Sequence, residues 1–158
     1  MSRTFIDKQQ REWIVEFTIA DLKKINARFE INFIGNLEFE LRRLMSDPIF
    51  LANVLYTVCE KQAKESGVDD ESFGRALAGD SLQKGRDALM EAITNFFPSQ
   101  AEREAVSAII EYGDKLATAL RVRAAEELSE VDVTEMVNQI VGESSTNLQE
   151  SSESIPVP

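Results

Sequence analysis

The stretch "SDPIFLANVLYTVCEKQAKESG", residues 46–67, decides the fold class of this 158-residue chain. An Asp at the N-cap followed by a Pro at the first helical position is a typical helix start, and Asp47 and Pro48 provide it. The apolar residues that follow recur at intervals of three and four, the spacing of one helix face. They are Leu51, Val54, Leu55, Val58 and Cys59. Gly67 suits the left-handed position that ends a helix, so we expect a long core helix here.

Upstream of this helix the sequence predicts a β-hairpin that leads into another helix. Two short segments, "RTFID" (3–7) and "REWIVEFTI" (11–19), are rich in aromatic and β-branched residues and are separated by a polar turn. Alternation with a period of two in the second segment indicates a half-buried strand. The residues expected to face the core are Trp13, Val15, Phe17 and Ile19. Thr18 and Asp21 have the spacing of a capping box, so a helix is expected over 20–29.

Four further helices are expected: one precedes the long core helix in the sequence and three follow it. Their ranges are 37–45, 71–79, 81–97 and 100–128. Pro98 should end the helix over 81–97, because proline has no N–H to donate. Ser99 and Glu102 form a capping box for the longest helix. The predicted fold is therefore mainly α: a compact helical domain over 1–128 with a short N-terminal β-hairpin and a long C-terminal helix.

After residue 128 the character of the sequence changes. The segment over 129–142 carries apolar residues with the spacing of one face of an amphipathic helix. They are Val133, Met136, Val137, Ile140 and Val141. The segment over 143–158 is rich in Ser, Glu and Pro and has almost nothing to bury. We therefore expect a disordered acidic tail there.

The stretch "GRALAGDS", residues 74–81, comes within one residue of the nucleotide-binding pattern G-x-x-x-x-G-K-[ST]. Asp80 stands where that pattern has its phosphate-binding lysine, and an acid repels an anion. The preceding residues have a helical pattern, whereas a P-loop follows a strand. We interpret this stretch as a corner between two helices, in which Gly79 allows the turn and Asp80 or Ser81 caps the second helix.

No other pattern in the sequence indicates catalysis or metal binding. The chain has no histidine, which removes the commonest general base and the commonest metal ligand. Cys59 lies among apolar residues and is interpreted as a core residue. Glu38 with Glu40, and Asp87 with Glu91, are pairs of acids typical of a solvated helix face. The sequence therefore predicts no catalytic, cofactor-binding or metal-binding residue.

The charge distribution argues against nucleic acid and membrane surfaces as partners. The net charge is −11, and all 17 Lys and Arg residues lie before Ser129, together with 22 of the 28 acids. A protein that binds a phosphate backbone needs clustered Lys and Arg instead. No stretch approaches the ~20 apolar residues that cross a bilayer, and the first residues lack the apolar run of a secretory signal. We expect a soluble cytoplasmic protein, which a single cysteine fits.

Two segments are predicted to bind another polypeptide. The long helix would span roughly 40 Å at 1.5 Å per residue, more than a domain of this size needs. Its candidate contact residues are Ile109, Leu116 and Leu120. The second segment is the amphipathic face over 129–142, which suits binding in the groove of a partner or self-association. Core packing within the chain is the alternative for both segments.

Two stretches, "REWIVEFTIADLKKI" (11–25) and "LMSDPIFLANVLYTVCEKQAKESGVDDESFGRALAGDSLQKGRDALMEAITNFFP" (44–98), carry a family resemblance. They combine an aromatic strand, a Thr-Ile turn into a helix, a helix that starts with Asp-Pro, a corner ending in Gly-Asp and a helix ending in Phe-Phe-Pro. In this order the features resemble the small proteins of phage tail modules that are described as tail assembly chaperones. The similarity covers 11–98, and residues 99–158 have no counterpart.

The resemblance implies a non-enzymatic assembly factor in the host cytoplasm. Such proteins bind the long, helical tape-measure protein and help tail tube subunits to polymerise around it, and in many a ribosomal frameshift appends a further domain. Two other classes stay open from the sequence. One is a structural virion component, such as a tail-completion or connector subunit. The other is an enzyme with a carboxylate site that the patterns above do not reveal.

Overall fold

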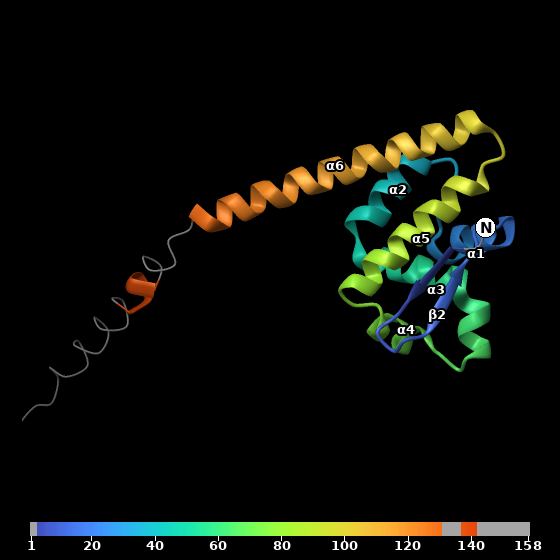
Figure 1. The fold of residues 1–158 in the computed structure, drawn as a ribbon, viewed down its shortest axis with the longest axis horizontal. Helices are drawn as coiled ribbons and strands as arrows, with labels where there is room; N and C mark the ends of the chain where they lie inside the picture. Colours follow the sequence, from blue (N-terminus) through green and yellow to red (C-terminus); the bar gives the residue numbers. More distant parts are fainter. Residues whose placement is uncertain (1–2, 131–136, 142–158) are drawn as a thin grey trace, which may run out of the picture. The chain divides into compact units, whose positions relative to one another are not determined.

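The predicted fold class is confirmed by a computed structural model, which describes residues 3–130 and 137–141. An antiparallel hairpin precedes six helices in the order β1-β2-α1-α2-α3-α4-α5-α6 (Figure 1). Their bounds are β1 Arg3–Ile6, β2 Glu12–Val15, α1 Ile19–Phe29, α2 Leu37–Ser46, α3 Pro48–Glu65, α4 Asp70–Ala76, α5 Asp80–Phe96 and α6 Gln100–Glu130. The chain divides within α6 into two units, Met1–Ala117 and Thr118–Pro158, whereas the sequence suggested a boundary at 128.

The hairpin turns one face toward the core of the first unit. Phe5 lies opposite Trp13 in the register, and both side chains are buried. Val15 and Phe17 are buried as the alternation predicted, but Ile19 is exposed. The prediction for Ile19 was wrong because the strand ends before it. Ile19 is the first residue of α1, where the period of two no longer applies.

A buried carboxylate holds the turn of the hairpin. Oδ2 of Asp7 accepts hydrogen bonds from Nε1 of Trp13 and Nε of Arg11, each at 2.8 Å. Oδ1 accepts from the backbone N–H groups of Gln9 and Arg11 at 2.8 and 3.0 Å. Four donors therefore compensate for the burial of this charge, which would otherwise be costly.

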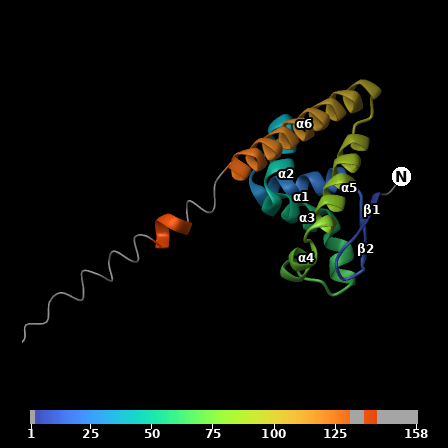
Figure 2. The same ribbon diagram turned by 60° about the vertical axis from the view of Figure 1, so that its left-hand side comes forward.

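Helix α3 lies at the centre of the first unit, and the elements around it begin and end largely as predicted (Figures 1 and 2). Asp47 caps α3 by accepting from the N–H groups of Ile49 and Phe50. The predicted capping box at the start of α1 is present. Gly67, just beyond α3, is left-handed with a φ of 67°. These local signals position α3 so that its apolar face forms the core.

Helix α5 packs closely against the hairpin because it carries a glycine at the contact. A Cβ on Gly85 would lie 2.9 Å from Cδ1 of Leu55 in α3 and 3.5 Å from the ring of Phe5 in β1. The absence of a side chain therefore lets three elements meet at one point. Both views show α5 beside β1 (Figures 1 and 2).

The glycine-rich stretch is the corner between α4 and α5. A helix precedes it, and Gly79 is left-handed with a φ of 60°, as the interpretation required. The capping prediction was wrong: Gly79 itself is the N-cap, no side chain caps the helix, and Asp80 is the first helical residue. Glycine can take the N-cap position without a side-chain acceptor, at a small cost in stability.

The first part of α6, up to Ala117, belongs to the first unit. Its predicted capping box is present, since Ser99 Oγ and Glu102 Oε2 are 2.6 Å apart and the backbone N–H of Glu102 donates back to Ser99. Val106 is buried in the core. Asp114 forms an ion pair with Arg86 of α5 at 3.4 Å. These contacts hold this part of the helix against the unit.

The second unit is described over 118–130 and 137–141. Every residue from Thr118 to Ser129 is exposed, and so is every residue over 137–141. The predicted tail over 143–158 lies outside the described residues. None of the helices described is long and apolar enough to cross a membrane.

Candidate protein-binding surface

In the first unit, α6 buries one face and exposes apolar side chains on another. The predicted contact residue Ile109 is half-buried and packs against the core, which leaves little of it for a partner. Leu116 is 43% exposed, and Tyr112 is also exposed, with the guanidinium of Arg42 5.7 Å from the centre of its ring. Of the two candidate residues in this unit, Leu116 is therefore the one available for contact.

In the second unit, apolar side chains are exposed along the continuation of α6. Leu120 is 59% exposed and Leu128 is 73% exposed. These two residues and Ala124 are spaced by four, so they form a line along one side of the helix. Arg123 and Glu127 form an i,i+4 ion pair at 3.2 Å, which supports the helix on a solvated surface. Leu120 and Leu128 therefore place exposed apolar surface on one side of this helix.

The amphipathic segment over 129–142 is described only in part. Val133 and Met136 lie outside the described residues. Val137, Ile140 and Val141 are helical and more than half exposed. Their spacing of three and four puts the three side chains on one helix face. The second unit therefore exposes two sets of apolar side chains, one on α6 and one over 137–141.

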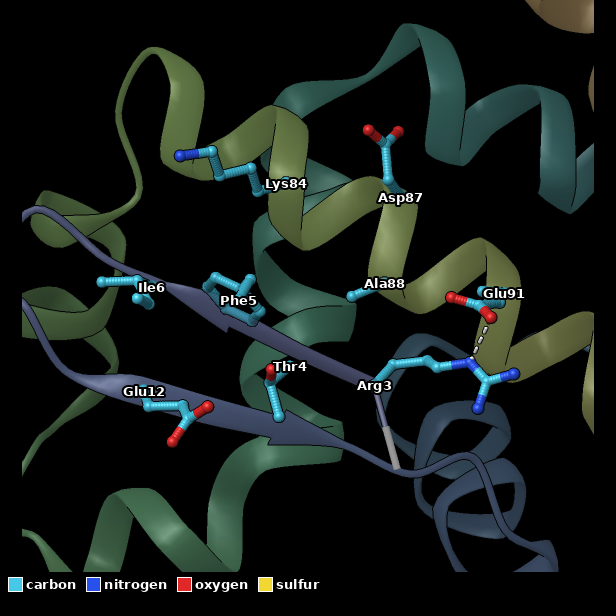
Figure 3. Close-up of a pocket in the computed structure, with 9 residues that line it drawn as sticks. All are labelled: Arg3, Thr4, Phe5, Ile6, Glu12, Lys84, Asp87, Ala88 and Glu91. Atoms are coloured by element: carbon cyan, nitrogen blue, oxygen red, sulfur yellow. Dashed lines mark ion pairs between the residues drawn. The ribbon is translucent and has the colours of Figure 1, made fainter. Parts of the chain in front are cut away.

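A groove lies beside β1, and sequence reasoning missed it. Its volume is about 630 Å³, and β1 forms one wall while α5 forms the other (Figure 3). Arg3 and Glu91 pair across it at 2.6 Å. Lys84 projects from α5 toward the opposite end, where Ile6 lies (Figure 3). No sequence pattern could reveal this groove, because it depends on where α5 lies beside the strand.

The two edges of the hairpin differ in how they are covered. On the β2 edge, Gln62 of α3 accepts from the N–H of Ile14 at 3.0 Å and donates to the C=O of Glu12 at 2.6 Å. The Sγ of Cys59 also lies 3.7 Å from the C=O of Ile14. The side chains of α3 therefore occupy the place of a neighbouring strand. The β2 edge is therefore not open to a further strand.

The described residues show little that resembles a catalytic site. Burial, and secondarily the negative charge of Asp21, raises the pKa of the Cys59 thiol to about 12, so this thiol is a poor nucleophile. Asp87 and Glu91 are exposed, as predicted. Over 3–130 and 137–141, no three Cys, Asp or Glu side chains are grouped so that they could hold a metal ion.

Glu40 departs from its prediction. It was expected on a solvated helix face with Glu38, but it is only 2% exposed. The buried face of α2 also includes Leu41 and Leu44, and Glu40 lies on that face. Its Oε2 accepts no hydrogen bond within the described residues, and Nη1 of Arg43 is 3.9 Å away. The solvated-face interpretation was therefore wrong for Glu40.

No protein family, curated protein or solved structure was found to match this chain.

Proposed function

We propose that the chain is a non-enzymatic phage tail assembly chaperone that binds helical segments of the tape-measure protein. The observation that carries the proposal is the exposed apolar surface of the second unit. Leu120 is 59% exposed, Leu128 is 73% exposed and Val137 is 51% exposed. A partner helix could bury them in the way that amphipathic helices bind.

The charge of the chain suits this role. Its net charge is −11, and the residues after 128 hold six acids and no base. A chaperone that covers apolar segments must keep the complex from associating with other copies. Strong like charge on each complex opposes such association and keeps it dispersed.

The resemblance over 11–98 supports the same class. The features that carry it are structural in this chain: the Asp-Pro helix start is the capped start of α3, and the Gly-Asp corner joins α4 to α5. Within the proposal, the first unit is the scaffold and the second unit carries the contacts to the tape-measure or tail tube protein. The proposed place of action is the cytoplasm of the host.

Co-expression tests the proposal. The chain would be produced together with the product of the long helical gene expected beside its own, and the soluble fraction of that product would be measured. The proposal predicts that the product stays in solution and co-purifies with the chain. If solubility does not change and the two proteins do not co-purify, the proposal is wrong.

A structural virion subunit is the second candidate. It is favoured by exposed apolar residues of the first unit that are not part of α6, since Phe39 is 65% exposed and Ile49 is 73% exposed. Several separate apolar sites suit a subunit that contacts more than one neighbour in a ring. Light scattering that shows a stable ring, together with the chain in purified particles, would favour this candidate over the chaperone.

A further inference from the structure

The line of apolar side chains on α6 in the second unit is the same in both directions along the helix. Leu120 and Leu128 lie four residues before and four residues after Ala124, and all three are exposed on one side of the helix. When this line is reversed about Ala124, each leucine comes level with a leucine again. The line is therefore complementary to itself in two helices that run in opposite directions about a two-fold axis.

We propose that this part of α6, residues 118–129, pairs antiparallel with the same residues of a second copy of the chain. The two-fold axis passes Ala124, whose small side chain lets the two helices approach closely. Leu120 of each copy packs beside Leu128 of the other, which covers side chains that are 59% and 73% exposed in the single chain. A tape-measure helix would have to displace the second copy, a step that rests on the proposed function.

The charges beside the line match the antiparallel direction. Arg123 and Glu127 border one side of the line and pair within the helix at 3.2 Å. In an antiparallel pair the same side of each helix meets, so Arg123 of one copy lies beside Glu127 of the other. Two bases and two acids then alternate around the axis. Charges in such a network contribute more to stability than an isolated ion pair on a surface does.

The parallel direction lacks this match. Arg121 and Ala125 border the other side of the line. In a parallel pair opposite sides meet, so Arg121 of one copy would lie beside Arg123 of the other, and the two bases would repel each other. In the antiparallel pair Arg121 meets Ala125, which carries no charge. Charges that flank an apolar seam set the orientation of paired helices in this way.

The order of charges along α6 is not the one that suits the helix by itself. The helix dipole favours bases in the last turn, but the last turn of α6 has none, and Glu127 lies near its end. An antiparallel second copy brings its Arg123 to this end of the helix. The pairing therefore gives a reason for an arrangement that costs the single helix stability.

Analytical ultracentrifugation of the full-length chain alone tests this inference without depending on the proposed function. We expect a reversible dimer, and its dissociation constant should rise about tenfold or more in R123E, because four acids then meet at the axis. The variant R123E/E127R restores alternating charges at the same net charge and should dimerise as the wild-type chain does. R121E makes the same change of charge on the other side of the line and should have little effect.

Mixing experiments test the direction of the pairing. The wild-type chain and R123E/E127R should each pair with themselves and not with each other, because a mixed antiparallel pair puts like charges side by side. Preferential formation of the mixed dimer would indicate parallel helices and overturn the inference. Equal dimerisation of R123E and R121E would also overturn it. So would a wild-type chain that stays monomeric at the highest concentration it reaches, which would leave the line free for a different polypeptide.

Discussion

Gly113 of α6 lies directly against Met45 of α2. A Cβ on Gly113 would be 2.2 Å from Cε of Met45 and 2.9 Å from its Sδ. Glycine thus lets this part of α6 approach α2 more closely than any other residue would. The contact explains why a residue with poor helix propensity stands in the middle of a long helix.

Gly113→Ala should therefore be less favourable than its helix propensity suggests. Alanine gains about 1 kcal/mol over glycine in a helix, but the end of the flexible Met45 side chain must move aside, which offsets part of this gain. The matched control is Gly74→Ala in α4, where a Cβ would have no atom within 4 Å. In urea unfolding, Gly74→Ala should stabilise the chain more than Gly113→Ala does. An equal gain for both variants would show that α6 does not press on Met45.

Asp7 should make the hairpin sensitive to acid. Burial raises its pKa, but the hydrogen bonds from Trp13, Arg11 and Gln9 outweigh burial, so the pKa of the folded state lies below the ordinary value. A lowered folded pKa contributes stability above the unfolded pKa of about 3.9, and this contribution is lost as the pH falls through the folded pKa.

Asp7→Asn should therefore lower the free energy of unfolding at pH 7 by about 1.5–3 kcal/mol, the range for hydrogen bonds to a charged group. When the pH falls below about 4, the variant should also lose less stability than the wild-type chain does. Urea unfolding at several pH values measures both effects. The exposed Asp87→Asn is the control and should change stability little. A variant of Asp7 with wild-type stability at pH 7 would contradict this account of the turn.

Gln62 should protect the β2 edge. Gln62→Ala removes the partners of the Ile14 N–H and the Glu12 C=O, so the Ile14 amide should exchange between about twofold and tenfold faster. Gln62→Glu keeps an acceptor for the Ile14 N–H and should keep most of its protection. Gln83→Ala, on an exposed face of α5, should have no effect on Ile14. Hydrogen exchange by NMR distinguishes these outcomes.

The sequence was sufficient where a local signal sets the structure. The capping pairs of Thr18 with Asp21 and Ser99 with Glu102 mark helix starts, because their side chains bond to backbone groups three residues away. The positive φ of Gly67 follows from its place after a helix. Such features depend on residues close in the chain, so a sequence pattern contains all that is needed to predict them.

The sequence was insufficient where the structure depends on how distant elements meet. Glu40 has the local pattern of a solvated acid, and its burial is decided by what packs on α2. The groove beside β1 needs α5 to lie along a strand far from it in the chain. Gln62 covers an edge 48 residues away, and no spacing rule connects it to Ile14. The glycines at 85 and 113 are the sequence features that could have indicated these close contacts, because a Cβ at either position would lie too close to a neighbouring side chain.

The central claim is that exposed apolar side chains of the second unit bind the tape-measure protein. The most direct measurement is the affinity of the full-length chain for that protein, compared between L120D/L128D and T118D/S129D. All four positions are exposed on α6, and each variant adds two negative charges to the same helix. The account predicts a loss of about tenfold or more for L120D/L128D and little change for T118D/S129D, since buried apolar contacts dominate such interfaces. An equal affinity for both variants would contradict it.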